Sequence, residues 1–175
     1  MGYETKISRG FTDLKPTAFT ANSNEQALDF RTSPVDKSNM AKFLFGGFSK
    51  CLYSVQKFHS EAERRLSVIL ERDAIKWFKP AKGQFQIYYK QGANYHEYQP
   101  DFVAETIDTI YMLEPKAKNE MSDAIVLLKK DVATIWCQKA TDFSLQHGGK
   151  PWKYVLIPHD KIADNQTLNG INSQF

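Results

Sequence analysis

The chain has 175 residues, of which 42% are hydrophobic and 25% are charged, and its formal net charge is +3. These values are typical of one folded domain and exclude a disordered, collagen-like or coiled-coil protein. The small basic excess is compatible with phosphate contacts, but it is far below that of a protein that covers nucleic acid with a strongly basic surface.

No apolar run approaches the ~20 residues of a membrane helix, and the first residues lack the hydrophobic stretch of a signal peptide. We therefore expect a cytoplasmic protein with no membrane partner. The two cysteines, Cys51 and Cys137, are far apart and form no C-x-x-C pair. They predict buried, reduced thiols and no metal site built on thiolates.

The first half of the chain predicts an irregular start followed by one clear helix. Residues 1–37 are polar and interrupted by prolines, which is typical of an irregular N-terminal arm. The aromatic-rich stretch 40–58 predicts one or two short helices that bend at Gly46 and Gly47. Ser60 and Glu63 match a capping box, and the apolar spacing after them predicts a helix over about 60–72.

The second half predicts strands, a long helix and a final strand. Residues 84–89, 101–104 and 110–114 are typical of strands, the last two joined as a hairpin, and together they predict an antiparallel sheet. Helical spacing continues from Ser122 to Gly148, and residues 154–157 predict a strand buried on both faces. Residues 163–175 are typical of a polar tail.

This order predicts an α/β domain over 38–162, with a mixed central sheet flanked by helices. Two polar motifs fall on its hairpin. Pro100 and Asp101 begin one strand, and Glu114-Pro115-Lys116 ends the next. Residues i and i+2 of a strand share a face, so Glu114 and Lys116 project together, and the hairpin brings Asp101 beside them.

Two carboxylates and a lysine at the end of a sheet predict a site for Mg²⁺, which takes oxygen ligands and binds substrate phosphate. A phosphodiester is the expected substrate, with Lys116 orienting water or stabilising charge. The [D/E]-x-K pattern also occurs at residues 4–6 and 13–15, so the tripeptide alone is weak evidence. The alternative is a solvated strand end with an ordinary Glu–Lys pair.

Five separated blocks lie between Phe58 and Ile162: FHSEAERR at 58–65, YQPDFV at 98–103, MLEPKAKNEM at 112–121, Trp136-Cys137, and GGKPWKYVLIPHD at 148–160. In this order they resemble the C-terminal nuclease region of type III restriction enzyme Res subunits and related helicase-nuclease proteins. That family is similar to the PD-(D/E)xK nuclease superfamily.

The resemblance implies a restriction-endonuclease-like fold and metal-dependent cleavage of DNA, with Mg²⁺ as cofactor and Mn²⁺ as its substitute. It assigns the metal to Asp101 and Glu114 and the water to Lys116. Glu63 matches an acidic residue that such nucleases present from the preceding helix, but the capping box explains Glu63 equally well. The implied partners are DNA, a helicase or ATPase domain or subunit, and a modification (methyltransferase) subunit.

Two features depart from the family pattern. Pro115 stands where a small polar residue is usual, and because proline removes a ladder donor, the strand should be at an edge or ending there. The chain also lacks the G-x-x-x-x-G-K-[S/T] motif, since Pro151 follows Gly149-Lys150. ATP hydrolysis is therefore expected from another domain or polypeptide.

Other residues have two interpretations each. His96 precedes Asp101 and either contacts substrate or lies on the surface of a turn. The segments 76–79 and 150–153 mix lysines with aromatic residues, which indicates either base stacking or buried rings beside solvated lysines. Contacts with the DNA backbone are expected from Lys118, Lys129 and Lys130.

The sequence thus predicts a Mg²⁺-dependent DNA endonuclease module of a type III-like restriction system. The alternative is a weak or inactive relative that contributes DNA binding or subunit contacts to a helicase complex. A nuclease acting on RNA or single strands is a third hypothesis.

Overall fold

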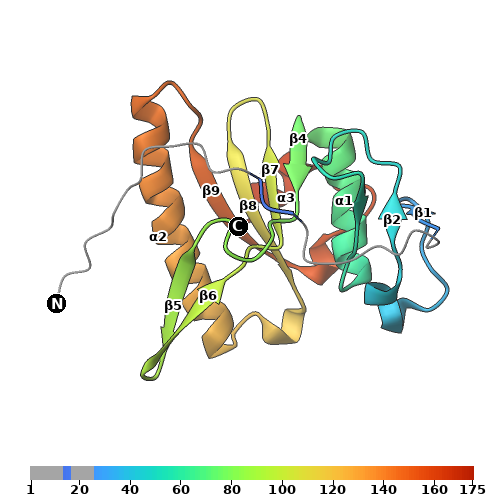
Figure 1. The fold of residues 1–175 in the computed structure, drawn as a ribbon, viewed down its shortest axis with the longest axis horizontal. Coiled ribbons are helices and arrows are strands. Elements are labelled where there is room, and N and C mark those ends of the chain that lie inside the picture. Colours follow the sequence, from blue (N-terminus) through green and yellow to red (C-terminus); the bar gives the residue numbers. More distant parts are fainter. Residues whose placement is uncertain (1–13, 17–25) are drawn as a thin grey trace.

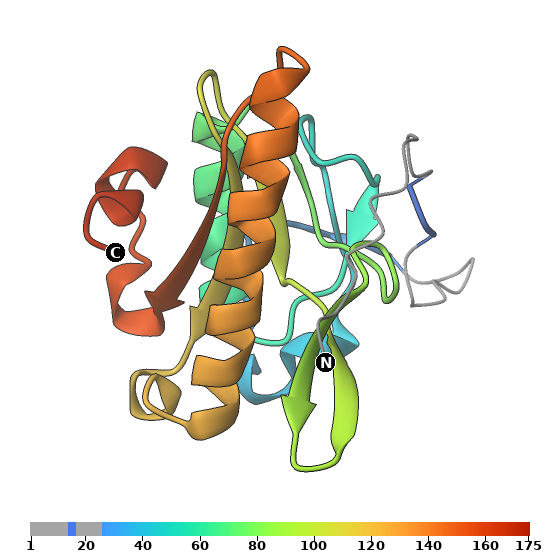
Figure 2. The same cartoon turned by 90° about the vertical axis from the view of Figure 1, so that its left-hand side faces the viewer.

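The computed structural model describes residues 14–16 and 26–175. The centre of the fold is a mixed sheet of four strands, which are, in spatial order, β4 (Lys76–Phe78), β7 (Phe102–Glu105), β8 (Ile110–Lys116) and β9 (Trp152–Pro158). The helices α1 (Glu61–Asp73) and α2 (Ala124–Gln146) lie on opposite sides of this sheet, as Figures 1 and 2 show. The predicted α/β class, with a mixed sheet flanked by helices, is confirmed.

The directions of the strands follow from the lengths of their connections. β7 and β8 form the predicted antiparallel hairpin, with Phe102 opposite Leu113, and β4 pairs antiparallel with β7. The connection from β8 to β9 runs through η2 (Lys118–Glu120) and α2, and these two strands are parallel. A crossover helix is the usual way to join parallel neighbours, so the final strand is confirmed as a buried partner of β8.

Local signals fix both long helices. Ser60 is the N-cap of α1, and its Oγ accepts a hydrogen bond of 3.1 Å from the backbone N–H of Glu63. The apolar side chains of α1, including Leu66 and Ile69, are buried against the sheet. α2 ends where the sequence predicts, just before Gly148, whose φ of 72° is a conformation that favours glycine.

Alternate residues of β8 supply two hydrophobic clusters. Leu113 packs with α1, Phe102 and Ile157 in the larger cluster on one face of the sheet. Met112 faces the other way and packs with Ala133 and Cys137 of α2. This alternation decides which face each neighbouring polar residue of β8 belongs to.

The prediction that residues 84–89 join the same antiparallel sheet is wrong. That region contributes β5 (Ile87–Gln91), which pairs with β6 (Asn94–Tyr98) in a separate hairpin turned at Gly92 and packed beside α2. The turn is so short that β5 pairs with the segment following it. The fourth strand of the central sheet is instead β4.

The segment before α1 also differs from the prediction of short helices over 40–58. It forms a small sheet of β1 (Leu28–Asp29), β2 (Phe45–Gly46) and β3 (Val55–Gln56), with a 3₁₀ helix, η1 (Lys37–Lys42), between the first two. A side chain at Gly46 would meet the Cβ of Ala27 at 3.3 Å, so glycine permits the close strand approach here. Within the expected arm, residues 1–13 and 17–25 lie outside the described part.

The structure places the expected polar tail differently as well. After η3 (His159–Lys161), residues Leu168–Asn172 form α3, and its apolar residues Leu168 and Ile171 are completely buried in the larger cluster. Two apolar residues among many polar ones are too few to reveal this helix by periodicity.

None of the helices in the described ranges is long and apolar enough to span a membrane.

Both cysteines are free thiols, and burial raises the pKa of Cys51 to about 11 and that of Cys137 to about 12. Thiols with such raised pKa values are poor nucleophiles and poor metal ligands at neutral pH.

Candidate active site at the end of the central sheet

The β7–β8 register brings the two predicted carboxylates together. Phe102 lies opposite Leu113, and the same register continued by one residue sets Asp101 opposite Glu114. Lys116 follows two residues later on the face of Glu114. The group lies at the lower end of the sheet in Figure 1, where β7 begins and β8 and β9 end.

Glu114 is buried, with 6% of its surface exposed, and its Oε2 accepts a hydrogen bond of 2.8 Å from the hydroxyl of Tyr98. Burial and, secondly, the charge of Asp101 raise the pKa of Glu114 to about 8. The negative charge of Asp101 therefore disfavours ionisation of Glu114.

Asp101 is the centre of the charged group. Burial raises its pKa, the charges of Lys79 and Lys116 lower it, and the charge of Glu63 raises it again. These charges come from different elements, because Glu63 belongs to α1 and Lys116 to β8. The structure thus brings together all four predicted catalytic residues: Glu63, Asp101, Glu114 and Lys116. We call these four residues the acidic cluster.

Glu63 shows features of both of its proposed roles. Its backbone N–H makes the expected capping bond to Ser60, but its carboxylate accepts from the backbone N–H of His59 at 3.1 Å rather than closing a standard capping box. The same oxygen, Oε2, lies 2.7 Å from Nζ of Lys79. Glu63 therefore contributes to the helix start and also faces the cluster.

Pro115 fits the sheet because of its position in β8. It is buried and pairs with Ile157 of β9, but it lies beyond Leu113, the last residue of β8 that pairs with β7. This part of β8 has a strand neighbour on one side only. The expectation of an edge or a strand end is therefore met locally, although β8 as a whole is a central strand.

Sequence reasoning missed three neighbours of this site: Lys79, Tyr98 and His159. Lys116 pairs with Pro158, so His159 emerges from β9 at the same end of the sheet. Burial lowers the pKa of His159, and the charges of Glu63 and Lys116 act on it as well. The parallel pairing of β8 and β9 was the signal that could have located His159.

The donor set suits a hard cation only in part. Among residues 14–16 and 26–175, no three His, Cys, Asp or Glu side chains converge in a group ready to hold a metal ion. Mg²⁺, however, is commonly bound by one or two carboxylates together with waters and substrate phosphate. Asp101 and Glu114 meet that smaller requirement, and the half-buried Asp101 and Lys116 form its accessible edge.

The three lysines expected to contact DNA lie near this end of the fold but have different surroundings. Lys118 is exposed, and its Nζ is 3.9 Å from Asp160. Lys129 lies over the ring of Tyr89 at 5.7 Å, and its charge lowers the pKa of Glu114. Lys130 is exposed on α2.

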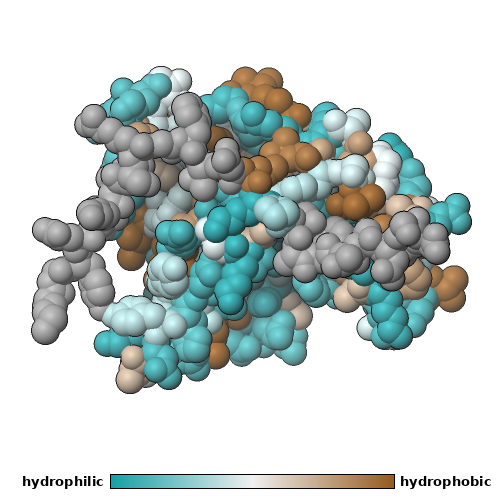
Figure 3. All heavy atoms as spheres, viewed as in Figure 1, coloured by the Kyte–Doolittle hydropathy of each residue, from teal (hydrophilic) through white to brown (hydrophobic). Residues whose placement is uncertain are grey.

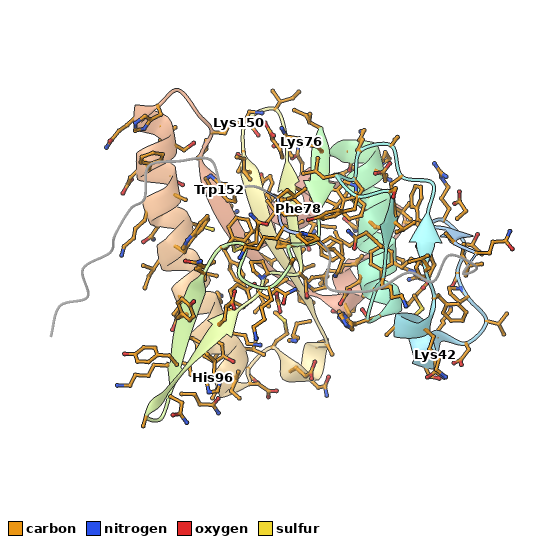
Figure 4. All side chains as sticks on the ribbon, viewed as in Figure 1. Lys42, Lys76, Phe78, His96, Lys150 and Trp152 are labelled. Atoms are coloured by element: carbon orange, nitrogen blue, oxygen red, sulfur yellow. The ribbon has the colours of Figure 1, made fainter. Side chains whose placement is uncertain are left out.

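The two segments that mix lysines and aromatic residues are mainly structural. Lys76 and Lys150 lie at the opposite end of the sheet (Figure 4), where they contact Glu105 at 3.1 and 2.8 Å. Trp77 is buried, and Trp152 packs against the cluster of α2. His96 is an exposed residue of β6 that stacks on Tyr89 at 5.6 Å.

In the view of Figure 3, the surface at the lower end of the sheet and over the β5–β6 hairpin is mainly hydrophilic.

Comparisons of the chain with protein-family models, with curated proteins and with solved structures found no match.

Proposed function

We propose that the chain is a metal-dependent DNA endonuclease module with a restriction-endonuclease-like fold, acting within a type III-like restriction system. The observation that supports it is the pairing of Phe102 with Leu113, next to which Asp101 and Glu114 lie at the same end of the sheet, with Lys116 on the same strand end. The order of the sequence blocks that resemble Res subunits supports the substrate class and the system.

In this proposal the reaction hydrolyses a phosphodiester: water attacks phosphorus, the bond to one ester oxygen breaks, and that oxygen takes up a proton. Asp101 and Glu114 would hold a Mg²⁺ or Mn²⁺ ion, which would polarise the phosphoryl oxygen and activate the attacking water. Lys116 donates hydrogen bonds to the attacking water or to the phosphate.

The neighbouring residues orient these groups. Tyr98 fixes the Glu114 carboxylate by donating a hydrogen bond of 2.8 Å to its Oε2. Glu63 adds negative charge behind Asp101. Side chains that are already fixed lose little conformational freedom when the substrate reacts, which favours catalysis.

The test is plasmid cleavage with Mg²⁺ or Mn²⁺. We expect Asp101→Asn and Lys116→Met each to reduce the cleavage rate by at least about 100-fold, a loss typical of removing a charge-stabilising group. Asp108→Asn is the matched control, because Asp108 is an exposed carboxylate at the far end of the same hairpin. Equal cutting by all four proteins would reject this site.

A second candidate, a DNA-binding or subunit-contact module without activity, is favoured by the Lys79–Glu63 ion pair and the burial of Glu114. A site whose carboxylates are already compensated by lysines has less need of a cation. This candidate predicts no cleavage but DNA binding that weakens steeply with salt. Lys129→Met and Lys130→Met together should reduce the salt slope, whereas Asp101→Asn should not.

The resemblance to Res subunits supports the proposed partners, which are a helicase or ATPase domain or subunit and a modification subunit that supplies sequence recognition. The chain itself has no G-x-x-x-x-G-K-[S/T] motif. Co-purification with such subunits, and cleavage that depends on ATP only in their presence, would support the restriction-system assignment.

A further inference from the structure

Lys79 occupies an unusual position for a lysine. It follows β4, and only 12% of its side chain is exposed. Its Nζ lies 2.7 Å from Oε2 of Glu63, 4.2 Å from the ring centre of Phe102 and 5.8 Å from that of Phe58. One carboxylate and two aromatic faces therefore hold this ammonium group inside the protein.

The charge of Lys79 acts on a second carboxylate as well. Among the charges around Asp101, that of Lys79 has the largest effect, and it opposes the effect of Glu63. Lys79 thus lies close to two of the acidic residues, on the α1 side, while Lys116 approaches from the end of β8. The charges of both lysines and of Glu63 therefore act on the Asp101 carboxylate.

From this geometry we infer that Lys79 is the built-in counter-ion of the acidic cluster, a positioning residue that competes with a divalent cation for the same negative charge. The inference rests on the proposed function, because it assumes that Asp101 and Glu114 bind the cation. Lys79 keeps Glu63 in place when no cation is bound, and it limits how tightly a cation binds. Removing its charge should make cation binding stronger.

The test is to titrate the full chain with Mn²⁺ and to measure binding in two ways: by calorimetry and by the rise in Tm that Mn²⁺ causes. We expect Lys79→Gln, which keeps a donor for Glu63 but loses the charge, to lower the dissociation constant for Mn²⁺ roughly tenfold. Lys79→Arg should remain near wild type. Lys150→Met is the matched control, since Lys150 also pairs with a carboxylate at 2.8 Å but lies at the other end of the sheet.

The outcomes separate the two proposals. Wild-type binding of Mn²⁺ that Asp101→Asn abolishes, with tighter binding by Lys79→Gln, supports both. Unchanged binding by Lys79→Gln overturns the role of Lys79 and leaves the metal site standing. If Lys79→Gln binds Mn²⁺ and the wild type does not, the result supports the role of Lys79 as counter-ion and means that Lys79 blocks the native site. If no variant binds Mn²⁺, both proposals are overturned. A lower Tm without a change in Mn²⁺ affinity identifies a merely structural lysine.

Discussion

At the residue scale, the acidic cluster shows how burial and charge act against each other. Glu114 is buried beside Asp101, which disfavours two negative charges at once. Lys79 and Lys116 partly offset this repulsion. The cation-free protein can therefore relieve the remaining repulsion by keeping a proton on Glu114.

This proton makes stability depend on pH. The folded-state pKa of Glu114, about 8, is above its unfolded value. The contribution of the protonated carboxyl to the free energy of unfolding is therefore fully present below about pH 4.5 and is lost as the pH rises through 8. Glu114→Gln stays neutral and its oxygen can still accept from Tyr98. Without divalent cations, we expect the free energy of unfolding of the variant, relative to that of wild type, to rise by on the order of 3 kcal/mol from pH 5 to pH 9.

Urea unfolding at several pH values measures this difference. Glu105→Gln is the control. Lys150 lowers the pKa of Glu105, so the ionisation of Glu105 changes the stability only at acidic pH. Its stability relative to wild type should not change between pH 6 and pH 9. A constant difference for Glu114→Gln over the whole range would contradict the raised pKa.

At the element scale, local signals predicted the elements that sequence neighbours determine. The cap at Ser60, the hairpin around Asp108 and the long helix before Gly148 depend on residues a few positions apart, and all three were found. Asp101 and Glu114 could be paired from the sequence for the same reason, since a short hairpin joins them.

The remaining elements depend on contacts between distant segments. β4 has three residues and is defined by pairing with β7, far along the chain. Lys79 reaches the site only because β4 lies next to β7, and His159 only because β9 pairs with β8. No short window of sequence contains these relations, which is why both residues were missed.

Glu71 of α1 illustrates how one side chain joins such segments. Its carboxylate accepts from the backbone N–H groups of Ser49, Lys50 and Cys51 and from Nε1 of Trp77, all at 2.8–3.0 Å. We expect Glu71→Ala to lower the free energy of unfolding by about 3 kcal/mol, because several donors lose a charged acceptor.

Chemical denaturation of the purified variant tests this expectation. Glu120→Ala, which removes an exposed carboxylate from η2, should change the stability by less than about 0.5 kcal/mol. If Glu71→Ala is as stable as Glu120→Ala, water replaces the lost acceptor and the carboxylate does not hold the loop to the helix.

At the scale of the whole molecule, one core joins segments from both ends of the described chain. The larger cluster contains Phe30 from the turn after β1, Phe45 of β2, residues of α1 and of the central strands, and Ile171 from α3. Domain limits at residues 38 and 162 would therefore cut through a continuous core. Neighbouring parts of this core should unfold together, because each part buries the apolar surface of the next.

Ile171 tests whether the last helix belongs to that cooperative unit. It is completely buried, and α3 is attached to α1 by a hydrogen bond of 2.8 Å from the backbone N–H of Leu168 to Asp73. Ile171→Ala should cost about 2–4 kcal/mol and leave a single unfolding transition, since a cavity in a shared core weakens the whole of it. Asn169→Ala, exposed on the same helix, should cost far less. A neutral Ile171→Ala, measured by thermal unfolding, would mean that residues 163–175 behave as the polar tail their composition indicates, and that the core ends with β9.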